Sequence, residues 1–134
     1  MTTQLTDHPH ILLAEDDEDD QEFMKDAFQK ASLSFNLHIA ENGQQVLDYL
    51  VSQQQLPCLI ILDLNMPVMD GFQTLEALNQ KPEFKEIPIV ILTTSNSESD
   101  KRKCFSKGAT EYLVKPTNMT DIVKTVVSMV RHCD

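Results

Sequence analysis

The segment CLIILDL (58–64) decides the fold class, because it is apolar at nearly every position until Asp63. A strand with one face in solvent alternates apolar and polar residues, whereas a strand buried on both faces is apolar throughout. The segment IPIVILTT (87–94) has the same character. Two short runs of this kind predict central strands of a parallel sheet that is covered by helices on both faces.

Three further apolar runs of similar length extend the pattern along the chain. They are HILLA (10–14), FNLHIA (35–40) and EYLVK (111–115). FNLHIA alternates between apolar and polar positions, which places it at an edge of the sheet. The sequence therefore predicts five strands, of which two are central and at least one is an edge strand.

Apolar residues at helical spacing lie between these strands and after the last one. The clear stripes are Phe23, Met24, Ala27, Phe28 and Ala31; Val46, Leu47, Leu50 and Val51; Phe72, Leu75 and Leu78; and Ile122, Val123, Val126, Val127 and Val130. A fifth, poorly anchored helix is predicted over 96–107, with Gly108 as its stop. Alternating strands and helices predict a flavodoxin-like doubly wound (βα)5 fold with a five-stranded parallel sheet in the order 2-1-3-4-5.

Length and charge exclude several classes of protein. A chain of 134 residues has the size of one domain, predicted over 10–134 after a flexible tail over 1–9. The net charge of −10 argues against direct binding to nucleic acid, whose phosphates repel an acidic protein. No apolar run approaches the roughly 20 residues that span a bilayer, and the N-terminus does not read as a signal peptide.

The cysteines predict a reduced, cytoplasmic protein. Cys58, Cys104 and Cys133 are odd in number and widely spaced, and they form no metal-ligand pattern. This spacing argues against a disulfide framework. Three reduced thiols in the cytosol are therefore expected.

Six consecutive acids, Glu15 to Asp20, directly follow the first strand. In this fold, ligands bind beyond the carboxyl ends of the strands, at the switch point between the first and third strands. Glu15 and Asp16 end the first strand and Asp63 ends the third, so their carboxylates are expected to converge. Converging carboxylates need a cation, and hard oxygen ligands favour Mg²⁺. The remaining acids, Asp17 to Asp20, are expected to begin a helix, whose dipole favours negative charge.

The other strand ends complete the constellation. The fourth strand ends in the hydroxyl of Thr93, and the fifth ends in Lys115-Pro116. Carboxylates, a hydroxyl and a lysine around one Mg²⁺ form a site that fits phosphoryl transfer, which depends on positioning and on charge neutralisation. Asp63 is the carboxylate that could carry the phosphoryl group as an acyl phosphate.

Four motifs resemble the receiver domains of two-component response regulators over essentially the whole chain. They are ILLAEDD (11–17), LIILDLNMPVMDGF (59–72), IPIVILTT (87–94) and GATEYLVKP (108–116). The resemblance implies that Asp63 accepts a phosphoryl group from a phosphohistidine on a sensor histidine kinase or a histidine phosphotransfer protein. It also implies that the chain catalyses only its own phosphorylation and dephosphorylation and is not otherwise an enzyme.

The resemblance further implies roles for individual residues. Mg²⁺, with Mn²⁺ as the alternative, would be held by Glu15, Asp16, Asp63 and the backbone carbonyl of Asn65. The remaining implied roles are phosphoryl contact for Thr93 and Lys115, a switch formed by Thr93 and Tyr112, a cis peptide bond between Lys115 and Pro116, and tuning of dephosphorylation by Asn65 and Ser95.

The last predicted helix is followed directly by the end of the sequence at Asp134, so no output domain is expected. Such a receiver is expected to act by docking onto an unidentified downstream protein, or onto its own copy through the face of the fourth and fifth helices. The stretch NQKPEFKEIPIVILTTS (79–95) resembles the small response regulators that are paired with phytochrome-type kinases.

Three rival interpretations can be weighed against this one, and the sequence disfavours the first two. A phosphatase of the haloacid-dehalogenase type also uses an aspartyl nucleophile with Mg²⁺, but its second aspartate would stand where this chain has Asn65. A flavodoxin-like electron carrier would need a phosphate-binding loop after the first strand, where this chain has repelling acids. A receiver that only scaffolds is the third rival, although no catalytic position of the family is missing.

Overall fold

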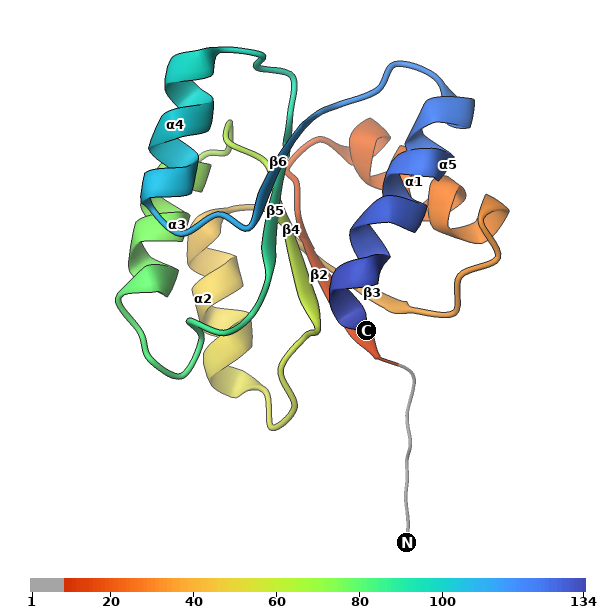
Figure 1. Cartoon of the computed structure of the whole chain (residues 1–134). Helices are drawn as coiled ribbons and strands as arrows, with labels where there is room; N and C mark the ends of the chain where they lie inside the picture. The colour runs from red at the N-terminus through yellow and green to blue at the C-terminus, as the bar shows by residue number, and fades with distance from the viewer. Residues whose placement is uncertain (1–8) are drawn as a thin grey trace, which may run out of the picture.

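The computed structural model describes residues 9–134, so the predicted tail over 1–9 lies outside the described residues apart from Pro9. The structure contains one sheet of five parallel strands: β2 (His10–Ala14), β3 (Asn36–Ala40), β4 (Leu59–Leu62), β5 (Ile89–Thr93) and β6 (Glu111–Val114). Their order across the sheet is β3-β2-β4-β5-β6 (Figure 1). In chain order this is 2-1-3-4-5, so the predicted flavodoxin-like topology is confirmed.

Helices cover both faces of this sheet (Figure 1). One face carries α1 (Glu18–Lys30) and α5 (Met119–Met129), and the other carries α2 (Gly43–Ser52), α3 (Gly71–Asn79) and α4 (Glu98–Ser106). A short 3-10 helix, Val130–Cys133, follows α5. No described helix is both long enough and apolar enough to cross a membrane.

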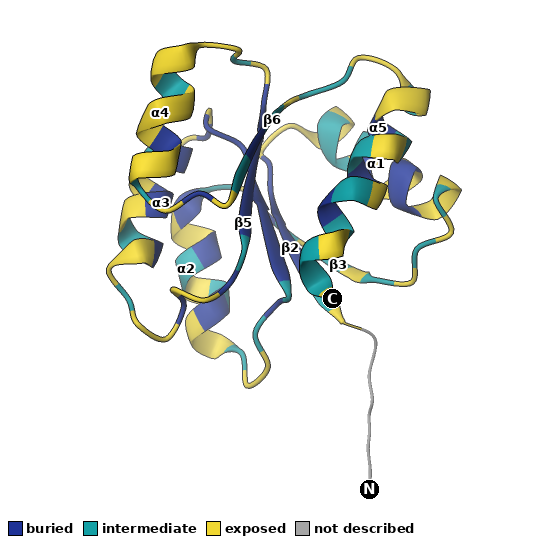
Figure 2. Ribbon diagram, in the orientation of Figure 1, coloured by how far each residue is buried: buried dark blue, intermediate teal, exposed yellow. Residues whose placement is uncertain are grey.

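The sheet separates two apolar cores, and the buried residues follow it closely in Figure 2. Successive side chains of a strand point to opposite faces, so Ile60 belongs to the core under α2, α3 and α4, and Ile61 to the core under α1 and α5. Every residue of β4 and β5 is buried, as predicted for central strands, and β3 alternates as an edge strand should.

Each of the five α-helices begins at a side-chain cap in the loop that follows a strand. Every cap accepts a hydrogen bond from the backbone N–H three residues later, and the capping residues are Asp17, Asn42, Asp70, Ser97 and Asn118. The predicted weak helix is α4, which buries only Cys104. Its chain then turns at Gly108, which has a φ of +105°.

The prediction of three reduced thiols is wrong for two of them. Cys58, just before β4, and Cys133, in the last 3-10 helix, form a disulfide with 5.0 Å between their Cα atoms. They lie 75 positions apart, and only the packing of the chain's last turn against the start of β4 brings them together. Cys104 is the free thiol among the described residues, and burial raises its pKa to about 11.

Three aromatic rings pack at the amino-terminal side of the sheet. The ring of Tyr49 on α2 stacks on His38 with 3.9 Å between centroids, and its edge meets His10 at 5.9 Å. The Nε2 atom of His10 is buried without a hydrogen-bond partner among residues 9–134. Burial, followed by the charge of His38, lowers the pKa of His10 below its ordinary value of 6.5.

This cluster predicts a loss of stability in mild acid. The unfolded chain binds a proton on His10 at a higher pH than the folded chain does, so stability is fully present above about pH 6.5 and falls as the pH drops below that value. Urea unfolding at a series of pH values between about 8 and about 5.5 measures the slope of the free energy of unfolding against pH. A His10→Phe variant should show a shallower slope, and an unchanged slope would contradict the assignment.

Candidate phosphoryl-transfer site

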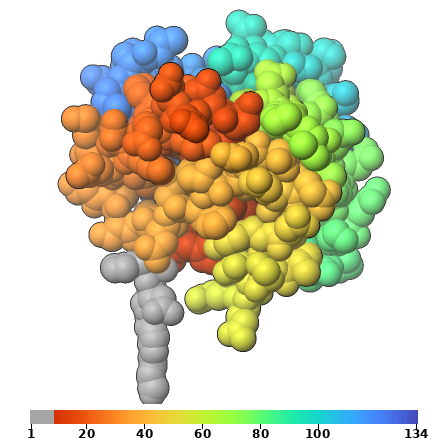
Figure 3. Space-filling model, turned by 180° about the vertical axis from the view of Figure 1, so that it is seen from behind, coloured from red at the N-terminus to blue at the C-terminus, as the bar shows by residue number. Residues whose placement is uncertain are grey.

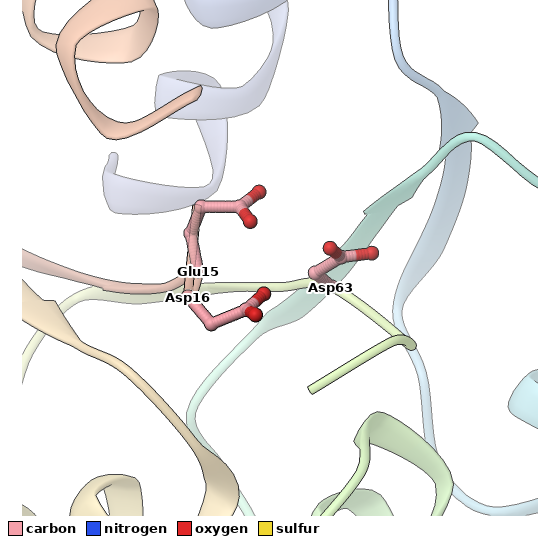
Figure 4. Close-up of side chains that lie close together, drawn as sticks. All are labelled: Glu15, Asp16 and Asp63. Carbon is pink, nitrogen blue, oxygen red and sulfur yellow. The ribbon is translucent and has the colours of Figure 1, made fainter. Parts of the chain in front are cut away.

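Three predicted carboxylates meet at the carboxyl ends of two neighbouring strands. One oxygen atom each from Glu15, Asp16 and Asp63 lies within 4.8 Å of the other two. Figure 4 shows Glu15 and Asp16 on one segment and Asp63 on the adjacent one, with their carboxylates grouped. Glu15 and Asp63 are only 3% and 7% exposed, whereas Asp16 is exposed. The predicted convergence is therefore present.

The strand register places these acids at the same level. Ala14 at the end of β2 pairs with Leu62 at the end of β4, and the residue that follows each of these strands is an acid. The N–H of Asp63 donates to the carbonyl of Ala14 at 3.2 Å, which continues the ladder by one residue. Because β2 and β4 are parallel neighbours, both strands deliver their acids to the same edge of the sheet.

Lys115 bridges the two buried carboxylates, Glu15 and Asp63, and also contacts Asp20. Its Nζ atom donates to Glu15 at 2.7 Å, to Asp20 at 2.9 Å and to Asp63 at 3.2 Å. Burial opposes the charge of the ammonium, but the hydrogen bonds with Glu15 and Asp20 and the charge of Asp63 outweigh it and raise the pKa of Lys115 above its ordinary value. The lysine therefore stays charged across the physiological range of pH.

The two buried carboxylates are held in different ways. Burial raises the pKa of Glu15, despite the opposing effect of Lys115. The Oδ1 atom of Asp63 accepts a hydrogen bond from the N–H of Leu64 at 2.8 Å. The Oδ2 atom faces Lys115. Asp63 thus has one oxygen fixed by the backbone and one oxygen directed at the cation.

Asp20 belongs to this site, although its place in the acid run predicted only the start of a helix. Its carboxylate contacts Lys115 from the first turn of α1. Asp20 lies in the first turn of α1, whereas Asp16 precedes the capping residue Asp17 and lies outside the helix. Nothing in the run of six acids distinguishes Asp20 from its neighbours.

The predicted switch residues form a chain of contacts. The carbonyl of Thr93 accepts a hydrogen bond from the N–H of Lys115 at 2.7 Å, and its Oγ1 accepts one from the N–H of Ser95 at 3.4 Å. The hydroxyl of Tyr112 donates to the carbonyl of Ser95 at 2.9 Å. The hydroxyl of Ser95 donates to Asp100 on α4 at 2.7 Å. Thr93, Ser95 and Tyr112 are therefore connected to one another and to α4.

One prediction about the loop after β6 is wrong. The described residues contain no cis peptide bond, so the bond between Lys115 and Pro116 is trans. The trans state is the ordinary preference of a peptide bond before proline.

Asn65 lies exposed in the loop two residues after Asp63. Its backbone carbonyl is the group that was predicted to bind the metal ion.

A cavity of about 440 Å³ opens beside the acids, between α1 and α5. Phe23, Met24 and Ile122 line its apolar side, and Thr94, which was not among the predicted site residues, also lines it. Figure 3 shows from behind that the red residues at the start of α1 lie between the blue C-terminal segment and the green residues that follow β4. The site is thus assembled from segments far apart in sequence.

Comparisons with known proteins agree with this site. Residues 11–127 match the family model of the response regulator receiver domain. The response regulator Rcp1 of Synechocystis sp. is 34% identical over 121 residues, which cover 87% of this chain and 82% of Rcp1.

Two solved structures have the same fold. The first is described as the phosphorylated cyanobacterial phytochrome response regulator RcpA, with a TM-score of 0.85, 27% identity and 93% of each chain covered. The second is described as the Mn²⁺-bound form of Rcp1, with a TM-score of 0.80, 32% identity and 91% of each chain covered. The chain belongs to the family of response regulator receiver domains, the phosphorylation-based signalling modules of two-component systems.

Proposed function

We propose that this receiver accepts a phosphoryl group on Asp63 from the phosphohistidine of a sensor histidine kinase or a histidine phosphotransfer protein in the cytoplasm. The observation that carries the proposal is the placement of Asp63 Oδ2, which lies 3.2 Å from the ammonium of Lys115 within a cluster of carboxylates. Catalysis by the chain is then limited to its own phosphorylation and dephosphorylation.

The two oxygens of Asp63 have separate roles in this step. Oδ1 is held by the N–H of Leu64, so Oδ2 is the atom that bonds to phosphorus. The phosphorus–nitrogen bond of the phosphohistidine breaks, and the nitrogen keeps the electron pair. The phosphoryl group brings about −1.5 to −2 of charge. Lys115, already at the cluster, contacts the phosphoryl oxygens, and the hydroxyl of Thr93 is the second proposed contact.

The donors present fit a hard divalent cation. Three carboxylates within 4.8 Å of one another supply oxygen ligands, and two of them are buried. Glu15, Asp16, Asp63 and the carbonyl of Asn65 are the residues that would hold Mg²⁺, which would supply charge neutralisation for the incoming phosphoryl group. The Rcp1 structure described as Mn²⁺-bound supports Mn²⁺ as the alternative ion.

The signal would leave the site through the contacts of Thr93. Ser95 links Thr93 both to Tyr112 on β6 and to Asp100 on α4, so a shift of Thr93 toward the phosphoryl group changes both elements. Asn65, two residues after Asp63, and Ser95, two residues after Thr93, are the proposed determinants of the rate of dephosphorylation.

The proposed docking face consists of α4, β6 and α5. Phe105 on α4, Val114 on β6 and Val127 on α5 are large apolar residues that each expose 40% or more of their surface. Apolar side chains exposed on neighbouring elements are typical of protein–protein contacts. The proposed occupant is a downstream protein or a second copy of this receiver.

The test is phosphorylation by acetyl phosphate, followed by intact mass spectrometry. Wild type should gain one phosphoryl group in the presence of Mg²⁺ and none after chelation, and Asp63→Asn should gain none. Asp48→Asn, an exposed aspartate on α2, is the matched control and should be labelled like wild type. Labelling of Asp63→Asn at the wild-type level would refute the site.

A further inference from the structure

We propose that Cys58 and Cys133 form a reversible thiol–disulfide modification site whose reagents are small thiols and disulfides. In this proposal, the oxidation state of the pair determines how firmly the end of α5 is held on the sheet. Neither residue belongs to the phosphoryl-transfer site, so the modification chemistry does not depend on the proposed function.

The accessibility of the cysteines supports a modification site. Cys58 and Cys133 are both partly exposed, so a small reagent can reach them. Cys104 is fully buried, and its raised pKa keeps it as a thiol. Thiol–disulfide exchange requires a thiolate and access to it. The structure therefore separates a reachable pair from a third cysteine that is protected.

The attachment of the last helical turn depends strongly on this bond. The 3-10 helix Val130–Cys133 contains no fully buried residue, unlike each of the five α-helices, and only Val130 and Cys133 are partly buried against the core under α1 and α5. Besides the disulfide, its side-chain polar anchor is the contact of His132 Nε2 with Glu111 at 2.9 Å. A partly exposed pair of this kind contributes little to stability. Reduction of the disulfide should therefore release this turn.

Release would affect two strands at once. Cys58 directly precedes β4, the strand that leads to Asp63. Glu111, the partner of His132, is the first residue of β6. The 3-10 helix also continues α5 without a break, because Val130 follows Met129. Oxidation thus ties the end of α5 to the start of β4 and keeps His132 beside Glu111 on β6. This part of the proposal rests on the proposed docking face, which includes β6 and α5.

The exchange balances with a small disulfide such as oxidised glutathione. The thiolate of one cysteine attacks the reagent's sulfur–sulfur bond and releases one glutathione thiolate. The second cysteine attacks the mixed disulfide and releases the second thiolate. The protein is oxidised by two electrons, the reagent is reduced by two, and two protons pass to the released thiolates. If the chain is cytoplasmic, as proposed, a disulfide there is typically transient and redox-sensing.

The first experiment equilibrates the whole chain without oxygen at a series of ratios of reduced to oxidised glutathione. Samples are quenched in acid, unfolded, alkylated and mapped by mass spectrometry. Cys58 and Cys133 should convert together across the series, while Cys104 is alkylated at every ratio. The proposal is overturned if the pair stays reduced at every ratio, or if it stays oxidised at every ratio.

The second experiment measures the mechanical consequence by hydrogen exchange and urea unfolding. Reduction should speed hydrogen exchange at 111–114 and 126–134. It should also raise the equilibrium constant for unfolding, by about a thousandfold according to the chain-entropy relation for a 75-residue loop. The double variant Cys58→Ser/Cys133→Ser should behave like reduced wild type in both oxidising and reducing buffer. Cys104→Ser should still change its exchange and its stability when the disulfide is reduced. Equal exchange at these segments in both redox states would overturn this half of the proposal.

Neither measurement uses phosphorylation. Failure of the redox site would leave the labelling of Asp63 untouched, and failure of labelling would leave the redox site untouched.

Discussion

Lys115→Met is expected to lower the free energy of unfolding by about 3–5 kcal/mol when divalent cations are absent. The change removes the ammonium that donates to Glu15, Asp20 and Asp63, and methionine keeps most of the side chain's volume. Glu15 and Asp63 would then be buried close together without a cation, and removing one member of a buried ion pair costs more than the pair itself contributes.

The measurement is urea unfolding of wild type and Lys115→Met in a chelator. Lys107→Met is the matched control, because Lys107 also pairs with a carboxylate, Glu76 at 2.6 Å, but at a site where Glu76 is exposed. The control should lose at most about 1 kcal/mol. A loss for Lys115→Met no larger than that of the control would show that the acids do not depend on this lysine.

Added Mg²⁺ should restore part of the stability of Lys115→Met. A divalent cation at Glu15, Asp16 and Asp63 would offset the same charges that the lysine offsets in wild type, so Mg²⁺ should stabilise the variant more than wild type. Repeating the unfolding series with Mg²⁺ measures the difference. An equal gain in stability for both proteins would show that Lys115 and Mg²⁺ do not offset the same charges.

The fold could be predicted because the apolar pattern records burial directly. CLIILDL (58–64) and IPIVILTT (87–94) contain β4 and β5, two of the three interior strands, and the edge strand β3 alternates. The acids could be predicted to meet for the same reason, since the end of a strand in a parallel sheet fixes where the next residue lies. Glu15 and Asp63 follow directly from the ends of β2 and β4.

Features that depend on three-dimensional packing were not visible in the sequence. The contact of Asp20 with Lys115 depends on the rotation of α1 about its axis, which the acid run does not reveal. The disulfide depends on where the last turn packs, 75 residues away from Cys58. Val68 adopts a φ of +67°, which a β-branched residue rarely does. No pattern in the sequence predicted this backbone conformation.

Gly71→Ala is expected to lower the free energy of unfolding by about 3 kcal/mol and to slow phosphorylation of Asp63. A Cβ atom on Gly71 would lie 2.5 Å from the carbonyl oxygen of Asp63 and 2.7 Å from the Cα atom of Leu64. Both are backbone atoms, so they cannot rotate away as a side chain would. The N–H of Gly71 also donates to the carbonyl of Leu64 at 3.0 Å, which ties α3 to the loop that carries Asp63.

The methyl group must therefore displace either α3 or the acceptor loop. Displacement of a reacting group by about 1 Å can slow a reaction about a hundredfold, so labelling by acetyl phosphate should slow more than the loss of stability alone would explain. Ala77→Gly in the same helix is the control, with a loss of about 1 kcal/mol from helix propensity and an unchanged labelling rate. If Gly71→Ala lost stability but kept the rate of labelling, the helix would have moved instead of Asp63. If it kept both, the close approach of α3 to the acceptor loop would be wrong.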